Sequence, residues 1–148
     1  MIDRGSITLR SATGADAERI ASLFTDEGFP VGASGVTARL ERFNVPGSRV
    51  IVADGGGELL GFIAIHVIPR FEHDEPFVRI VALVVDPGVR ERGVGRLLME
   101  EAEQVGRRDG AAFVEVTAGH HRADARRFYE SLEYDSTVTT YLRKRLGS

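Results

Sequence analysis

Residues 84–98 read Val-Val-Asp-Pro-Gly-Val-Arg-Glu-Arg-Gly-Val-Gly-Arg-Leu-Leu, and this stretch decides the fold that we expect. The preceding residues 77–85 are almost continuously apolar and β-branched, as in a central strand covered on both faces. From about Gly93 onward, Val94, Leu97 and Leu98 begin an apolar stripe with helical spacing. The stretch therefore predicts a buried strand that leads through a short loop into an amphipathic helix.

This junction has the properties of an anion site. The first N–H groups of a helix have no partner within the helix, and the helix dipole is positive at that end. Gly93 and Gly95 remove side chains that would keep a phosphate from those N–H groups, and Arg90 and Arg92 add positive charge. A diphosphate is the ligand that this pattern favours. The alternative is a helix that merely begins with glycines after a solvated loop, which would show the same sequence pattern.

The rest of the chain predicts strands first and then alternating helices and strands. Apolar spacing, turn residues and glycines place the other strands at residues 7–10, 49–54, 59–68, 112–117 and 137–146, and the other helices at about residues 13–27, 35–43 and 125–132. Residues 69–76 form an acidic loop. This order predicts one domain over residues 1–148, an α/β sandwich with a mixed sheet.

Composition narrows the classes of function. The 148 residues are 43% hydrophobic and 28% charged, which is an ordinary globular balance, and the net charge of −3 gives no reason to expect nucleic-acid binding. The absence of cysteine excludes disulfides, thiolate zinc sites and cysteine nucleophiles. The first residues do not resemble a signal peptide and no apolar run has the length of a membrane span, so we expect a cytoplasmic protein.

Two motifs in this order resemble the GNAT superfamily of N-acetyltransferases. The family's coenzyme A motif, Arg/Gln-x-x-Gly-x-Gly/Ala after a strand that ends in Val-Asp-Pro, is matched by residues 85–87 and 90–95. A second family stretch, Ala-x-x-Phe-Tyr-x-x-x-Gly-Phe/Tyr, is similar to residues 125–134. The resemblance implies a mostly antiparallel mixed sheet with helices on both faces and a splayed central strand pair. It implies acetyl-CoA as co-substrate.

The resemblance also implies which residues meet acetyl-CoA. The backbone of the central strand would pair with the pantetheine arm, and the N–H groups of residues 92–96 would hold the pyrophosphate. The residues that we expect at this site are Leu83, Val84, Val85, Arg90, Arg92, Gly93, Val94, Gly95, Arg96, Arg122, Ala125 and Phe128.

The general acid implied by the resemblance is Tyr129. Many family members have a tyrosine at this position, near the sulfur, and a phenol with an ordinary pKa near 10 is suited to protonate a departing thiolate. Tyr129 is also the kind of aromatic residue that packs a core. The family has glycine where this chain has Glu133, so a left-handed turn there would cost about 1 kcal/mol.

The general base is not evident from the sequence. Many family members have a glutamate within the central strand, where this chain has Val81 and Ala82. The substitutes are His66 on a strand, Glu72 with its neighbours to residue 75 in the acidic loop, and Glu115 on the strand beyond. His66 and the acidic loop each have a purely structural alternative, as a histidine satisfied in the sheet and as a solvated run of charges. A chain of water molecules would serve equally.

We therefore expect an N-acetyltransferase in which a primary amine, on a small molecule or a protein, attacks the thioester directly. A coenzyme A-binding sensor without catalysis is the alternative, and a toxin that acetylates aminoacyl-tRNA is disfavoured by the charge. Neighbouring histidines of an extended segment point apart, so we expect no metal at His120 and His121. Residues 24–45 and 68–76 would choose the amine, and the acids in the second range hint at a cationic one. Homodimers are common in the family.

Overall fold

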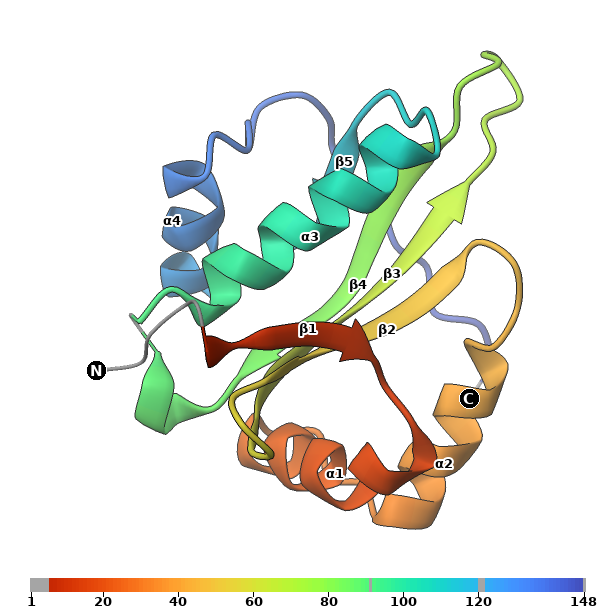
Figure 1. Cartoon of the computed structure of the whole chain (residues 1–148). Helices are drawn as coiled ribbons and strands as arrows, with labels where there is room; N and C mark the ends of the chain where they lie inside the picture. Colours follow the sequence, from red (N-terminus) through yellow and green to blue (C-terminus); the bar gives the residue numbers. More distant parts are fainter. Residues whose placement is uncertain (1–5, 91, 120–121, 148) are drawn as a thin grey trace. The chain divides into compact units, whose positions relative to one another are not determined.

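The computed structural model describes residues 6–90, 92–119 and 122–147 (Figure 1). These residues group into two compact units, Met1–Val116 and Thr117–Ser148, which are described separately below.

The first unit is built on a five-stranded sheet. Its strands, in spatial order, are β1 (Thr8–Ser11), β2 (Ser48–Asp54), β3 (Leu59–Ile68), β4 (Phe77–Val85) and β5 (Val114–Val116). The first four strands pair antiparallel and β5 pairs parallel with β4. The mixed and mostly antiparallel sheet that the sequence predicted is therefore confirmed.

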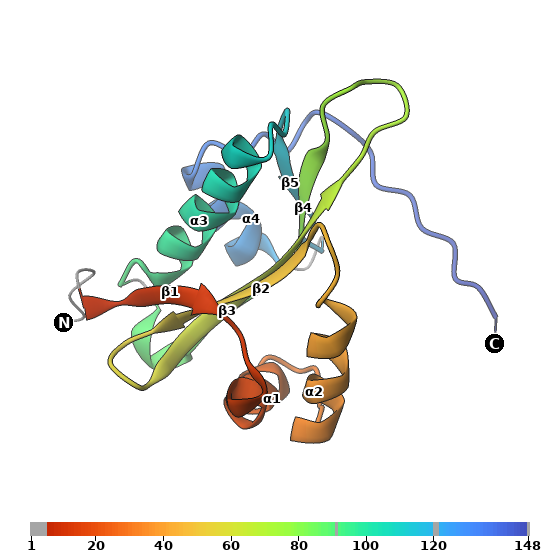
Figure 2. The ribbon, with the colours of Figure 1, turned by 45° about the vertical axis from the view of Figure 1, so that its right-hand side comes forward.

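Helices cover both faces of this sheet. Helices α1 (Ala17–Asp26) and α2 (Ala33–Arg42) lie against one face, and α3 (Val94–Arg108) lies against the other (Figure 2). Short 3-10 turns, η2 (Gly14–Asp16) and η3 (Pro87–Val89), precede α1 and follow β4.

Successive side chains of β3 point alternately to these two faces and pack against the helices on each of them. Phe62 is 1% exposed and packs in the cluster that contains Leu23 of α1 and Val36 of α2. The next residue, Ile63, points to the opposite face, where Leu98 of α3 is also fully buried. Each fully buried side chain of this size contributes about 1.5–3 kcal/mol to folding. The central strands are therefore apolar on both sides.

The second unit contains α4 (Ala123–Ser131) and the residues that follow it. After the helix, Glu133 has a φ of 71°, and the N–H of Tyr134 donates to the carbonyl of Tyr129 at 3.1 Å. The backbone of this turn is therefore left-handed at Glu133, a position where glycine would be favoured. The chain keeps the turn at the expected cost of about 1 kcal/mol.

The strand predicted at residues 137–146 is wrong. Residues 139–147 have no regular secondary structure, and the side chains of Val138, Leu142 and Leu146 are 75%, 85% and 91% exposed. These apolar residues have the spacing of one strand face. A strand also needs a partner for its backbone hydrogen bonds, and the pattern within the segment does not specify one.

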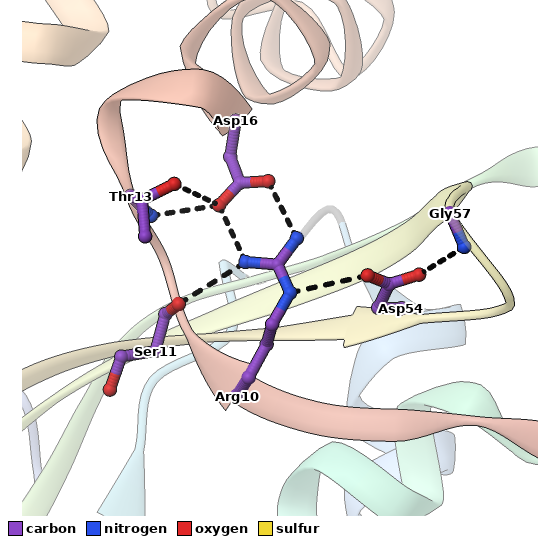
Figure 3. Close-up of polar contacts among 6 residues, drawn as sticks. All are labelled: Arg10, Ser11, Thr13, Asp16, Asp54 and Gly57. Atoms are coloured by element: carbon purple, nitrogen blue, oxygen red, sulfur yellow. Dashed lines mark hydrogen bonds and ion pairs between the residues drawn. The ribbon is translucent and has the colours of Figure 1, made fainter.

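An arginine between two carboxylates ties β1 to the start of α1 and to β2 (Figure 3). Arg10 donates from both terminal nitrogens to Asp16, at 2.8 and 2.9 Å, and from Nε to Asp54 at 3.2 Å. Asp16 also accepts from the N–H of Thr13 at 2.8 Å, as in a capping box. Asp16 is only 7% exposed, and its hydrogen bonds to Arg10 lower the pKa of its carboxyl group.

Removing the charge of Asp16 should weaken the fold and reduce its sensitivity to acid. A carboxylate whose pKa is lower in the folded state stabilises the protein above its unfolded pKa of about 3.9, and this stability is lost as the pH falls through the folded value. Asp16→Asn should therefore cost about 1–3 kcal/mol of unfolding free energy at pH 7, and less below pH 4.

Urea unfolding from pH 7 to pH 3 measures both effects. Asp26→Asn is the control, because Asp26 is an exposed residue of α1. Equal pH dependence in Asp16→Asn and the wild type would show that the Arg10 cluster does not carry this stability.

Candidate functional site

Half of one edge of β4 extends beyond the strand next to it. β5 pairs only with Val78, Arg79 and Ile80, whereas β3 pairs with β4 as far as Val85. In the described part of the first unit, residues 81–85 therefore have no strand beside them on the β5 side. The predicted splay of the central pair is confirmed. An exposed strand edge offers N–H and C=O groups to an extended polar ligand.

A β-bulge marks the start of this edge. Ala64 pairs with Ala82 and the next residue, Ile65, pairs with Ile80, so Val81 is the extra residue of β4. Its side chain is 47% exposed although the strand is central. Bulges bend a strand and redirect its side chains, and they are frequent beside active sites.

Asp86 holds the loop that leaves β4. Its Oδ1 accepts from the N–H of Gly88 at 2.8 Å, and its Oδ2 pairs with Arg19 of α1 at 2.5 Å. The N–H of Asp86 donates to the carbonyl of Leu60 at 2.8 Å. The loop is therefore fixed to β3 and to α1 before it reaches the arginines.

The first turn of α3 follows at once. Gly93 is the N-cap with a φ of 87°, a left-handed conformation that side chains disfavour. The N–H of Leu97 donates to the carbonyl of Gly93 at 3.0 Å, so the N–H groups of Val94, Gly95 and Arg96 come before the first helical bond. The turn thus has the geometry of an anion cradle.

The arginines around this turn have different partners. Arg90 forms an ion pair with Glu27, at the end of α1, so a carboxylate already engages its guanidinium. Arg96 pairs with Glu100 at 3.2 Å, but both side chains are about half exposed and the pair is weak. Arg92 is exposed, and Glu91 of the same motif lies outside the described residues. Arg92 and Arg96 are the cations best placed to flank an anion.

The three candidate bases lie in different environments. His66 of β3 shares a hydrogen bond of 2.8 Å between its Nδ1 and Ser48, and its ring stacks on Phe43 at 4.7 Å. Glu115 of β5 is paired with Arg79 of β4. Glu72 is exposed in the loop between β3 and β4. The structure does not bring these three groups together, and two of them already have polar partners.

The second unit carries the other predicted site residues on or beside α4. Arg122 is the N-cap of α4, and Ala125, Phe128 and Tyr129 lie within the helix. Burial raises the pKa of the Tyr129 phenol, and the charge of Arg122 opposes this only in part. Tyr129 therefore holds its proton at neutral pH, as a general acid must. His120 and His121 lie outside the described residues.

An apolar cavity between the helices α1 and α2 and the sheet was missed by sequence reasoning. Its volume is about 200 Å³, and its wall includes Phe24, Val36, Arg39, Phe62, Val81 and Ala82. The cavity depends on how three strands and two helices pack, which local sequence patterns do not reveal. The only hint of it in the sequence is the apolar spacing of α2 next to an arginine. The predicted acceptor region, residues 24–45, contributes to the wall, whereas the acidic loop does not.

The described residues contain neither a group of metal ligands nor a helix suited to a membrane. No three His, Cys, Asp or Glu side chains within them are grouped as ligands for a metal ion. None of their helices combines the length and the apolar character needed to cross a membrane.

Comparison with known proteins agrees with this geometry. Residues 17–134 match the model of the acetyltransferase (GNAT) family. An aminoalkylphosphonate N-acetyltransferase of Salmonella typhimurium is 30% identical over 126 residues, which cover 82% of this chain and 80% of that protein. The uncharacterized N-acetyltransferase YhfO of Bacillus subtilis is 28% identical, with 87% and 90% of the two chains covered.

Solved structures share the fold. A putative acetyltransferase from Agrobacterium tumefaciens matches with a TM-score of 0.84 at 20% identity, over 93% of this chain and 99% of the other. A protein described as a transcriptional regulator from Bacillus halodurans matches with a TM-score of 0.83 at 24% identity, over 95% and 99%. Because residues 17–134, most of this chain, match the family model, the chain belongs to the acetyltransferase (GNAT) family.

Proposed function

We propose that this chain is an acetyl-CoA-dependent N-acetyltransferase that transfers an acetyl group to a primary amine. The observation that carries the proposal is the continuity between the free edge of β4 and the first turn of α3. One extended ligand with amide groups at one end and a diphosphate at the other fits both features. We propose that residues 1–148 form one domain, because the family match runs across the boundary between the two units.

The residues present fit coenzyme A. The backbone of Leu83, Val84 and Val85 would hold the pantetheine amides in the manner of an added strand. The N–H groups of Val94, Gly95 and Arg96 would bind the pyrophosphate, flanked by Arg92. The family motif supports further contacts from Arg90 and Gly93 in this loop, and from Arg122, Ala125 and Phe128 in the second unit.

Acetyl-CoA supplies an acetyl group activated as a thioester. In the proposed transfer, a bond forms between the amine nitrogen and the acetyl carbon while the carbon–sulfur bond breaks. Backbone N–H near Val84 or Val85 would donate to the carbonyl oxygen as negative charge develops there. Tyr129 would then give its proton to the sulfur, which its raised pKa permits because the phenol is protonated at neutral pH.

We infer that water, rather than a dedicated side chain, takes the proton of the amine. Ser48 engages His66 and Arg79 engages Glu115, while Glu72 is exposed on a loop. A glutamate is absent from β4 at the bulge, where Val81 lies. Each candidate base thus has another role or lies in solvent, which favours relay by water.

The relatives differ in the acceptors that their names give. The Salmonella protein is named for aminoalkylphosphonates, whereas structural neighbours from soil metagenomes are described as aminoglycoside acetyltransferases. At 18–20% identity these neighbours share only the fold with this chain, so their acceptor is weak support for the acceptor of this chain. Both names are consistent with transfer to an amine.

Substituting Gly93 should weaken acetyl-CoA binding more than it weakens the fold. Gly93→Ala places a side chain in a left-handed N-cap, at a cost of about 1 kcal/mol, and shifts the N–H groups that follow. We expect the dissociation constant of acetyl-CoA to rise about 10-fold or more, which corresponds to about 1.4 kcal/mol, measured by calorimetric titration.

Gly110→Ala is the matched control. Gly110 follows α3 with a φ of 72° and nothing within 4 Å of an added Cβ, so the backbone strain is similar but the position is remote from the first turn. Equal losses of affinity in the two variants would contradict the cradle.

Removing the Tyr129 hydroxyl should slow turnover while leaving acetyl-CoA binding intact. The assay measures free thiol released from acetyl-CoA with a broad panel of primary amines, and the wild type should release thiol with at least one of them. With that amine, Tyr129→Phe should lower kcat about 100-fold where chemistry limits the rate, because the thiolate loses its proton donor.

Tyr141→Phe is the control, since Tyr141 is 58% exposed in the residues after α4. An unchanged kcat in Tyr129→Phe would refute the role of this phenol. Tight binding of acetyl-CoA without thiol release by the wild type with any amine would instead favour the alternative function, a sensor of coenzyme A.

A further inference from the structure

We propose that Arg39 and the apolar cavity beside β4 select a small amine that carries both a hydrocarbon body and an anionic group. The inference rests on the proposed transfer to an amine and specifies the acceptor. It follows from the composition of the cavity wall, from the position of Arg39 and from the contribution of β4.

The wall of the cavity is hydrocarbon apart from Arg39. Phe24 and Phe62 meet edge to face at 5.0 Å, and Val36 is 2% exposed beside them. A polar group placed against such a wall loses its water without gaining a hydrogen bond. The volume of about 200 Å³ is below the 300–1,000 Å³ that is usual for drug-sized ligands. The cavity therefore suits a small aliphatic or aromatic body.

Arg39 gives this apolar wall its charge. It is an exposed residue of α2, and its guanidinium carbon lies 6.0 Å from the centre of the Phe24 ring. None of the described residues brings a carboxylate within 4.0 Å of it, in contrast to Arg19 with Asp86. A guanidinium at the border of an apolar cavity binds carboxylate or phosphonate through charge-assisted, bidentate hydrogen bonds.

The same cavity reaches the strand that would hold the thioester. Val81 and Ala82 belong to its wall, and they immediately precede Leu83. An acceptor in the cavity would therefore lie next to the part of β4 that we assign to the pantetheine arm. Among the described residues that form this wall none is acidic, and the carboxylates of the loop at residues 72–75 do not contribute to it. A polycation would meet Arg39 and no opposite charge, which argues against the cationic acceptor at which the acidic loop hinted.

The test compares acids with their own amides. Thiol release would be measured with L-leucine and L-leucinamide, with 6-aminohexanoate and 6-aminohexanamide, and with cadaverine and kanamycin as cationic amines. Each acid–amide pair shares its hydrocarbon body, and in the 6-aminohexanoate pair the amine is far enough from the substituted group that the two members differ essentially in the anion alone. We expect kcat/KM to be at least about 10-fold higher for one of the acids than for its amide. This is the factor in affinity that one charge-assisted hydrogen bond typically contributes.

The decisive variant is Arg39→Gln, with Arg42→Gln as the control. Both arginines are exposed in the last turns of α2, but Arg42 does not line the cavity. Arg39→Gln should bring kcat/KM for the preferred acid down to about that for its amide, whereas Arg42→Gln should keep the difference between acid and amide. A second readout is binding: in the presence of coenzyme A, the preferred acid should raise the melting temperature of the wild type and not of Arg39→Gln.

The outcomes separate this inference from the proposed function. Turnover that favours amides, cadaverine or kanamycin would overturn the anionic acceptor and leave the acetyltransferase intact. An acid preference that survives in Arg39→Gln would overturn the role of Arg39. Failure to bind acetyl-CoA would overturn the proposed function itself.

Discussion

Strand β4 is paired with β3 from end to end except at the bulge of Val81, but its other edge meets β5 only at Val78, Arg79 and Ile80. A central strand normally satisfies both edges, because buried N–H and C=O groups are costly to leave without partners. Here the described part of the sheet is open on the β5 side of residues 81–85, and the loop after β4 leads directly to the first turn of α3. The features that we assign to coenzyme A depend on this asymmetry.

The strand–loop–helix junction and the mixed character of the sheet could be predicted from the sequence because their causes are local. Continuous β-branched residues specify a buried strand, and Gly93 with its positive φ specifies how α3 begins. The partner of Arg90 could not be predicted, since Glu27 is far away in the sequence. The segment after α4 was wrongly predicted as a strand because alternation reveals a face and not a partner.

The cavity is the part of the site for which the sequence held least information. Its wall comes from α1, α2 and three strands, so its size and its single charge are products of long-range packing. Nothing in the sequence distinguishes Arg39 from other arginines on the exposed face of a helix. Its significance arises only because an apolar cavity lies beside it, and because the bulge at Val81 brings β4 into the same wall. Family membership supports an acetyltransferase, while the choice of acceptor depends on such packing details.

Amide hydrogen exchange with and without saturating acetyl-CoA tests the assignment of this edge and turn most directly. The N–H groups of Val94, Gly95 and Arg96 precede the first helical bond, so they should exchange rapidly in the free protein. Binding should slow their exchange about 10-fold or more, together with amides of residues 83–85, and leave β1 unchanged. Slowed exchange confined to other segments, or none at saturation, would contradict the assignment.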